Sequence, residues 1–210
     1  DNKLYLDEIF TLIPSELNSK NKRFIMKNLN ENFKFSSYSN SFLWLKDAGV
    51  ALPVFCVEEP MVPLLLSKAT NLFKLFLSDV GLLASMYMND IQIKILNREK
   101  DINFGSIYEN VAAQELKAHG FSLYYFNNKK QGELDFVIER DGEVLPIEIK
   151  SGKDYSKHAA LNHVLKNPRY HISEGYVFYN GNVICQEKVT YYPVYMLMFV
   201  KNKEMKEKFI

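Results

Sequence analysis

Two carboxylates and a lysine, at Asp135, Glu148 and Lys150, are the residues of this chain whose types and spacing best suit chemistry. Glu148 and Lys150 are two residues apart, so in a strand their side chains share one face. Two carboxylates with waters are enough to hold Mg²⁺. A metal there could polarise a phosphate and lower the pKa of a bound water, while the lysine positions that water or stabilises developing negative charge.

A predicted β-hairpin brings these residues together. Residues 133–140 and 143–150 have the composition of strands, and Asp141-Gly142 between them is a dipeptide favoured in two-residue turns, where both positions need positive φ. With this turn, the register places Asp135 directly opposite Glu148. Opposed β-carbons lie about 5 Å apart, and like charges there are destabilising. We therefore expect a cation between the two carboxylates: the neighbouring lysine, a metal ion or both.

Alternation along the two strands predicts one face for the core and one for the site. The predicted core face is apolar and carries Leu134, Phe136, Ile138, Leu145, Ile147 and Ile149. The opposite face carries Asp135, Val137, Pro146, Glu148 and Lys150. The alternative is a surface hairpin with an ordinary Glu–Lys ion pair, which is common and contributes little. A one-residue bulge would break this register.

The elements around the hairpin follow the order helix, three strands, helix, strand. Helical periodicity covers Ser106–His119 and Ser156–Leu165, and short apolar strands are predicted over Phe121–Phe126 and Gly175–Tyr179. This order resembles the core of the PD-(D/E)XK nuclease superfamily. We therefore expect an α/β (α+β) protein with a PD-(D/E)XK, or restriction-endonuclease-like, αβββαβ domain over residues 105–210.

The resemblance also implies roles for individual residues. The superfamily's acid on the second core strand matches Asp135, and its acid-x-lysine signature matches Glu148-Ile149-Lys150. An acid on the first helix often completes the set and matches Glu109. The resemblance then implies that Asp135, Glu148 and the carbonyl of Ile149 hold Mg²⁺ or Mn²⁺. Lys150 would support the attacking water.

Glu109 has a second explanation from its local sequence. Ser106-Ile107-Tyr108-Glu109 fits a capping box, in which the glutamate bonds back to the backbone amide of the cap residue. The sequence does not separate this role from a contact to a metal or a water. Glu133 is expected beside Lys150 across the hairpin, as an ion-pair partner only.

A closer resemblance extends over nearly the whole chain. The segments IFTLIP at 9–14, FKLFLSDVGLL at 73–83 and GSIYEN at 105–110 are similar to a prokaryotic family of predicted AAA+ ATPases with a C-terminal domain of unknown function. The resemblance implies a preceding ATPase module as a partner, and a start at Asp1 without methionine fits an excised C-terminal half. No G-x-x-x-x-G-K-[ST] phosphate loop occurs, so ATP is expected to bind only through that missing half.

The N-terminal part, residues 1–89, is expected to be winged-helix-like, with residues 90–104 as a linker of mixed charge. Helices are predicted over Tyr5–Leu12, Asn21–Asn30 and Ser37–Ala48, and wing strands over Val50–Val57 and Phe73–Leu77. The third helix is expected to expose Tyr38, Asn40, Ser41 and Lys46 and to bury Trp44. Docking on DNA and packing on a protein module both remain open, because a fold does not determine function.

Basic residues that could contact DNA are few. The candidates are Lys22, Arg23, Lys27, Lys46 and Lys153. The formal net charge is only +1, which weighs against a general nucleic-acid binder. DNA binding by this chain is therefore expected to be weak.

The remaining composition is that of a cytoplasmic globular protein. The chain has 210 residues, of which 47% are hydrophobic and 24% charged. No apolar run is long enough to span a bilayer, so no membrane partner is expected. The two cysteines, Cys56 and Cys185, lack the spacing of metal ligands. A homo-oligomer is compatible with these features.

Two functions from different classes follow from the sequence. The first is the C-terminal module of an ATPase-family protein, nuclease-like, with a Mg-dependent phosphodiesterase site and DNA binding. The second is a catalytically inactive interaction or DNA-docking module that regulates the missing ATPase half.

Overall fold

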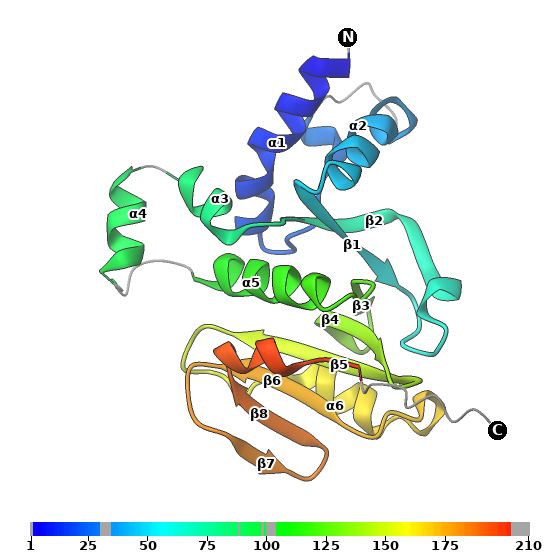
Figure 1. Cartoon of the computed structure of the whole chain (residues 1–210). Coiled ribbons are helices and arrows are strands. Elements are labelled where there is room, and N and C mark those ends of the chain that lie inside the picture. The colour runs from blue at the N-terminus through cyan, green and yellow to red at the C-terminus, as the bar shows by residue number, and fades with distance from the viewer. Residues whose placement is uncertain (1, 30–34, 88, 98, 100–103, 203–210) are drawn as a thin grey trace, which may run out of the picture.

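One mixed sheet of eight strands runs through both halves of the chain, in the order β2-β1-β3-β4-β5-β6-β8-β7 (Figure 1). The computed structural model describes residues 2–29, 35–87, 89–97, 99 and 104–202. The expected mixed α/β class is confirmed. Within the described residues, no helix combines the length and the apolar character needed to cross a bilayer.

The N-terminal half contributes two long helices and two strands to this architecture. They are α1 (Asn2–Asn18), α2 (Phe35–Asp47), β1 (Ala51–Val57) and β2 (Lys68–Leu77), with 3-10 turns η1 (Met26–Asn28) and η2 (Leu64–Ser67). β1 pairs antiparallel with β2 and parallel with β3 (Tyr124–Asn128), so the hairpin expected as a separate wing is the edge of the common sheet.

The helix expected over Asn21–Asn30 is wrong. Within the described part of that segment only the η1 turn is helical. Its amides have other partners: Phe24 N donates to Phe73 O of β2 at 3.0 Å, and Ile25 N donates to Glu16 Oε2 of α1 at 3.0 Å. These long-range bonds hold the segment extended against the sheet and α1 instead of letting it coil.

Two short helices connect the halves. They are α3 (Val80–Ser85) and α4 (Asn89–Leu96), and α3 is capped by Asp79 Oδ1, which accepts from Leu82 N at 2.7 Å. The linker predicted over 90–104 therefore contains most of α4 in its described part. Residues 98 and 100–103 of that linker lie outside the described residues.

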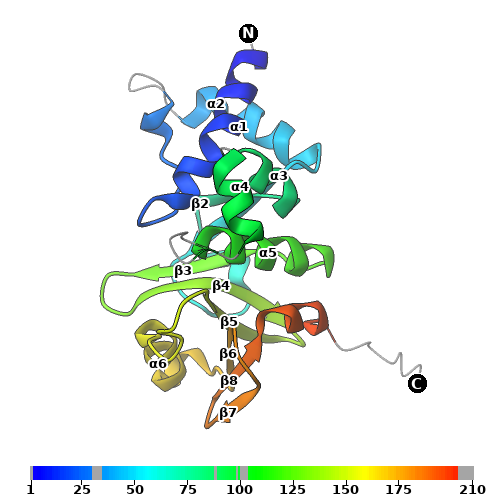
Figure 2. The same ribbon diagram turned by 90° about the vertical axis from the view of Figure 1, so that its left-hand side faces the viewer.

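The C-terminal half has the expected order of helix, three strands, helix and strand. Its elements are α5 (Gly105–Ala118), β3, β4 (Gly132–Arg140), β5 (Glu143–Lys150), α6 (Ala159–Lys166), η3 (Pro168–Tyr170), β6 (Gly175–Tyr179), β7 (Ile184–Gln186), β8 (Val189–Pro193) and η4 (Val194–Phe199). Figure 2 shows α6 and η4 on opposite sides of the strands β5 to β8.

Both faces of the central strands are covered, which differs from the expected single core face. Phe136 and Ile147 pack on the side of α5, with Leu116. Leu134 and Val137 pack on the side of α6. The expectation that Leu134 shares a face with Phe136 is therefore wrong. An irregularity in the β3–β4 pairing, between Tyr124 and Phe126 of β3, shifts the register there and breaks the alternation along β4.

The orientation of α2 also differs from expectation. Tyr38 and Ser41 are buried, whereas Trp44 is 65% exposed. Tyr38 packs edge-on against Tyr5 of α1 with ring centroids 4.9 Å apart. The face of α2 that carries Tyr38 therefore packs on α1, and Trp44 lies on the exposed side of the helix.

The hairpin turn provides a stability prediction. Asp141 and Gly142 have φ values of 55° and 84°, as a two-residue turn with both positions at positive φ requires. Gly142→Ala should destabilise the fold by about 1 to 2 kcal/mol because an L-residue is strained in the left-handed region. Gly152→Ala is the matched control, since that glycine has no positive φ and open space around its Cβ position. Urea unfolding of both variants measures this, and equal stability of the two would contradict it.

Candidate functional site

The β4–β5 hairpin holds the predicted site residues in the expected register. The pairs Arg140↔Glu143 and Phe136↔Ile147 fix the alignment of the two strands. The regular pairing ends at Phe136↔Ile147; beyond it, the side chains of Asp135 and Glu148 are in contact, and Asp135 Oδ2 accepts a hydrogen bond from the amide of Ile149 at 2.8 Å. Where the regular pairing of the two strands ends, the carboxylate of Asp135 accepts the hydrogen bond from β5. Its carboxylate is fixed in place by β5.

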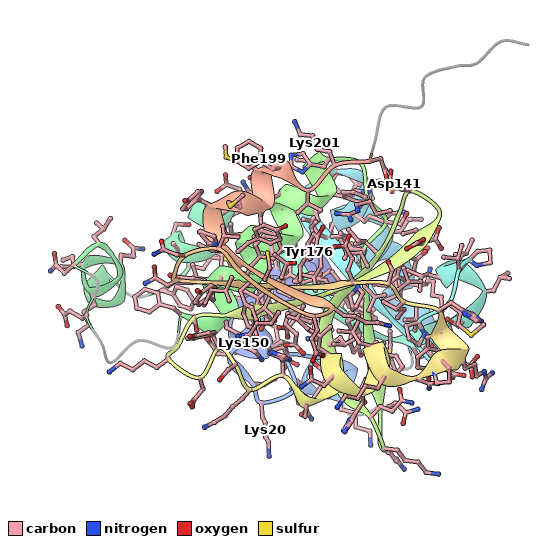
Figure 3. All side chains as sticks on the ribbon, turned by 90° about the horizontal axis from the view of Figure 1, so that it is seen from below. Lys20, Asp141, Lys150, Tyr176, Phe199 and Lys201 are labelled. Carbon is pink, nitrogen blue, oxygen red and sulfur yellow. The ribbon has the colours of Figure 1, made fainter. Side chains whose placement is uncertain are left out.

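A pocket of about 300 Å³ lies at this end of the hairpin. It is lined by Lys22, Gly105, Glu109, Asp135, Ile149, Lys150, Ser151, Gly152 and Asp154. The first helix of the C-terminal half, the hairpin and the loop after β5 therefore meet here. In Figure 3, Lys150 lies on the same side of the molecule as Lys20 and away from the Asp141 turn.

Glu148 is a buried carboxylate beside a second one. Only 4% of the residue is exposed, and Lys150 Nζ donates to its Oε2 at 3.0 Å. Burial raises the pKa of Glu148 to about 8, and the adjacent Asp135 contributes to the rise, while Lys150 opposes it. For Lys150, burial acts to lower the pKa, but the charges of Glu148 and Asp135 raise it above its ordinary value. Lys150 therefore carries a positive charge at neutral pH.

Glu109 faces the same pocket from α5 and is not part of a capping box. The helix begins at Gly105, before Ser106, and Ser106 Oγ donates to Asn18 Oδ1 at 2.9 Å. The Glu109 carboxylate binds Lys22, and its Oε2 is 4.0 Å from Lys74 Nζ. Within the described residues, this Oε2 accepts no hydrogen bond. Burial and then the charge of Asp135 raise the pKa of Glu109 to about 7, against the opposing charges of Lys74 and Lys22.

Lys74 is the site residue that sequence reasoning missed. It lies in β2 with 1% of its side chain exposed, and its Nζ is 2.8 Å from Glu133 Oε1. Burial acts to lower its pKa, but Glu109, Asp135 and Glu133 raise it overall. Its position between Phe73 and Leu75 could have revealed it, because a lysine inside a buried, apolar strand requires a charged partner. The expected pairing of Glu133 with Lys150 is wrong, since Glu133 binds Lys74 and Arg23 instead.

The five predicted DNA contacts do not form one surface. Lys22 and Arg23 are turned inward to Glu109 and Glu133. Lys153 is exposed in the loop after β5, beside the pocket, and Lys27 is exposed near the η1 turn. Lys46, at the end of α2, lines a different pocket with β1 and α5. Their contact with DNA stays a prediction.

The donor set fits a divalent cation through two carboxylates. Asp135 and Glu148 are in side-chain contact, and the repulsion that raises the pKa of Glu148 is relieved by a bound cation. Across the described ranges, no three or more His, Cys, Asp or Glu side chains are arranged to hold a metal ion. A metal here would use Asp135, Glu148 and backbone or water oxygens, as Mg²⁺ commonly does. Lys150 competes with it for Glu148.

Comparison with known families divides the chain in two. Residues 104–197 are similar to a family described as Domain of unknown function (DUF4143). Residues 1–94 are similar to a second one, Domain of unknown function (DUF8612). No curated protein and no solved structure matches the chain. The expected domain of unknown function is thus supported, and the two matches lie on either side of residues 95–103, inside the predicted linker.

The pKa of Glu148 predicts a pH dependence of stability. Its folded value of about 8 lies above the ordinary 4.5, so between these values the folded state holds a proton that the unfolded state lacks. Stability from this group is therefore full below pH 4.5 and is lost as the pH rises through about 8. Glu148→Gln cannot ionise, so relative to the unmodified chain it should become more stable from about pH 5.5 to about pH 8.5.

The measurement is the free energy of unfolding in urea at both pH values, with EDTA present. Glu143→Gln is the matched control, because Glu143 lies on the same strand but is exposed. A stability difference between Glu148→Gln and the unmodified chain that does not change with pH would contradict the assignment of a buried, proton-holding carboxylate.

Proposed function

We propose that this chain is a nuclease-like module that hydrolyses phosphodiester bonds with Mg²⁺ or Mn²⁺. One observation carries the proposal: Asp135, Glu109 and Lys150 line one pocket, and the buried Glu148 adjoins it. The element order from α5 to β6 supports a PD-(D/E)XK-like fold for residues 105–210, with each acid where that superfamily has one.

The chain's residues divide the work of this reaction. Asp135 and Glu148 would hold the metal, with the backbone of Ile149 beside them. When bound, the metal polarises the phosphate and lowers the pKa of a water. Lys150, a cation at neutral pH, stabilises the negative charge that develops on the phosphate and orients the attacking water. Glu109, held by Lys22 on the pocket wall, completes the acidic side of the site.

DNA is the proposed substrate, and the surface charge sets its affinity. Phosphate contacts dominate nucleic-acid binding and make it salt-dependent. Of the basic residues near the pocket, Lys22 is paired with Glu109, while Lys153 is exposed. We expect weak binding by this chain alone, strengthened when an ATPase module assembles with it. We also propose a cytoplasmic location, where the two free cysteines stay reduced.

A second candidate function is an inactive interaction module, and the surface of α2 favours it. Leu43 and Trp44 are exposed on adjacent positions of this helix. Together with Asn40, Asp47 and Ala48 they line a hollow of about 600 Å³. Exposed tryptophan is typical of protein contacts that carry much of the binding energy. In this alternative α2 docks on the ATPase module and the carboxylate cluster is a vestige.

A cleavage assay separates the two functions. With Mg²⁺ or Mn²⁺ at low salt, Asp135→Asn and Lys150→Ala should each lower cleavage of single- or double-stranded DNA by about a hundredfold or more, as loss of transition-state stabilisation does. Lys150→Ala should leave most DNA binding intact. Glu143→Gln, on the same hairpin outside the pocket, should cleave normally.

Cleavage that survives Asp135→Asn would show a contaminating nuclease and defeat the assignment. Absence of cleavage by this chain, both alone and with the proposed ATPase module, would favour the interaction module. In that case Trp44→Ala should weaken association with the ATPase module, while Asp135→Asn should not.

A further inference from the structure

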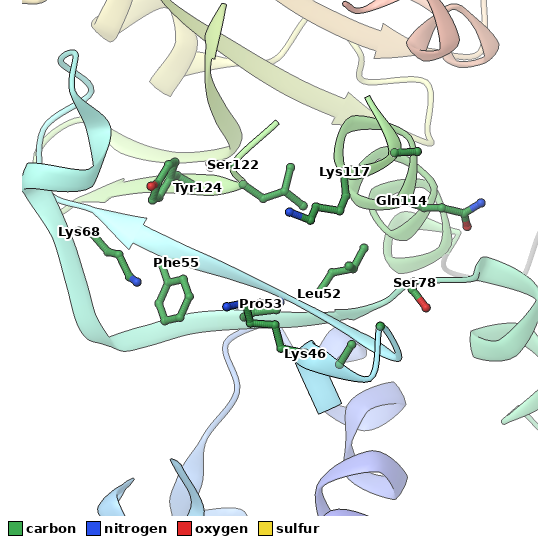
Figure 4. A pocket seen from close by; sticks show the side chains of 14 residues that line it. Lys46, Leu52, Pro53, Phe55, Lys68, Ser78, Gln114, Lys117, Ser122 and Tyr124 are labelled. Carbon is green, nitrogen blue, oxygen red and sulfur yellow. The ribbon is translucent and has the colours of Figure 1, made fainter. Parts of the chain in front are cut away.

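A second, larger pocket lies at the other end of α5. Its volume is about 730 Å³, within the range of about 300 to 1,000 Å³ typical of small-molecule sites. It forms where β1 of the N-terminal half pairs with β3 of the C-terminal half, beside the last turns of α5 (Figure 4).

Three lysines from three elements line this pocket. Lys46 lies in the last turn of α2, Lys68 begins β2, and Lys117 lies in the last turn of α5. Figure 4 shows the Lys117 side chain directed into the hollow, the Lys68 ammonium beside the Phe55 ring and Lys46 beside Pro53. Among the described residues that line the pocket there is no aspartate or glutamate. The pocket therefore concentrates positive charge without a lining carboxylate to balance it.

The nearest contacts of Lys68 and Lys46 do not neutralise their positive charges, which can therefore attract an anion. Lys68 Nζ lies 3.8 Å from the centre of the Phe55 ring, which holds the ammonium in place without neutralising it. Lys46 Nζ is 3.9 Å from Asp47 Oδ1, but both side chains are more than half exposed, so this pair is weak. An anion entering the pocket would be attracted by Lys68 and Lys117, with Lys46 adding positive charge at the border.

The walls of the pocket are apolar and aromatic. Phe55 and Tyr124 are aligned partners on β1 and β3, so their side chains lie on the same face of the sheet. Leu52, Pro53 and Leu123 extend the apolar wall, and Ser78, Gln114 and Ser122 add polar groups at its edge. A largely apolar cleft with a few convergent charges is the usual form of a site for an organic ligand.

We propose that this pocket binds a nucleoside phosphate, that is, a small anion in which a flat ring system is joined to one or two phosphate groups. A phosphate monoester carries about −1.5 to −2 charges at neutral pH, which matches several lysines acting as point charges. Because Lys68 covers one face of the Phe55 ring, the flat ring of the ligand would pack on the apolar wall of Leu52, Pro53 and Leu123.

The proposed site is separate from the carboxylate cluster. Glu109 and Lys117 are eight residues apart on α5, which corresponds to about 12 Å along the helix axis. The two pockets share no lining residue among those described. Because β1, β2, α5 and β3 all contribute, the ligand would bridge the segments 1–94 and 104–197 and stabilise their junction.

Calorimetric titration with ADP in EDTA, without divalent metal, tests this site. ADP should bind, and Lys68→Ala and Lys117→Ala should each weaken its affinity by about tenfold or more, as loss of a charge-assisted contact does. Both lysines are at least partly exposed, so the variants should fold. Lys130→Ala, at an exposed lysine in the β3–β4 turn, is the matched control and should bind ADP normally.

Two further ligands and one variant complete the test. Adenosine and inorganic pyrophosphate should each bind more weakly than ADP, since each supplies only one part of the ligand. Asp135→Asn should leave ADP binding unchanged, whether or not the chain cleaves DNA. The proposal would be overturned by no ADP binding at millimolar concentration, or by ADP binding to Lys68→Ala and Lys117→Ala as tight as that to the unmodified chain. Pyrophosphate binding as tight as that of ADP, or loss of ADP binding in Asp135→Asn, would also overturn it.

Discussion

Glu109 and Glu148 are buried next to Asp135, and because a buried negative charge is costly, the pKa of each glutamate is raised. Three lysines oppose this rise and stabilise the ionised forms: Lys150 from β5 acts on Glu148, while Lys22 from the segment after α1 and Lys74 from β2 act on Glu109. Two of these cations come from the N-terminal half. The site of the C-terminal half is therefore electrostatically incomplete without β2 and the turn at Lys22.

The sheet shared by the two halves makes these contacts possible. The parallel pairing of β1 with β3 brings β2, and with it Lys74, within reach of Glu133 and Glu109. The same pairing creates the larger lysine-lined pocket at the opposite end of α5. One structural junction thus positions both the carboxylate cluster and the proposed nucleoside phosphate site.

Local patterns in the sequence were sufficient for the hairpin and for the elements from α5 to β6. The turn at Asp141-Gly142 and the register from Arg140↔Glu143 to Phe136↔Ile147, which brings Asp135 near Glu148, follow from short-range rules of strand geometry. The identity of Lys74 as a partner of Glu133, and the inward turn of Lys22, depend on contacts between residues far apart in the chain. No local pattern encodes those contacts. The irregular β3–β4 pairing that moves Leu134 to the α6 face also cannot be predicted from strict alternation of side chains along a strand.

Whether Lys150 or a metal ion neutralises Glu148 decides between an active enzyme and an inactive remnant of one. Lys150 already occupies one of its oxygens, so the cluster is stable with the lysine alone, and a metal must compete for the same carboxylate. Calorimetric titration with Mn²⁺ measures that competition directly. We expect Mn²⁺ to bind to the unmodified chain and to Glu143→Gln. We expect Mn²⁺ binding to be lost in Asp135→Asn and Glu148→Gln. Absence of Mn²⁺ binding at millimolar concentration, or equal binding to Asp135→Asn, would contradict the assignment of Asp135 and Glu148 as a metal-dependent hydrolytic site.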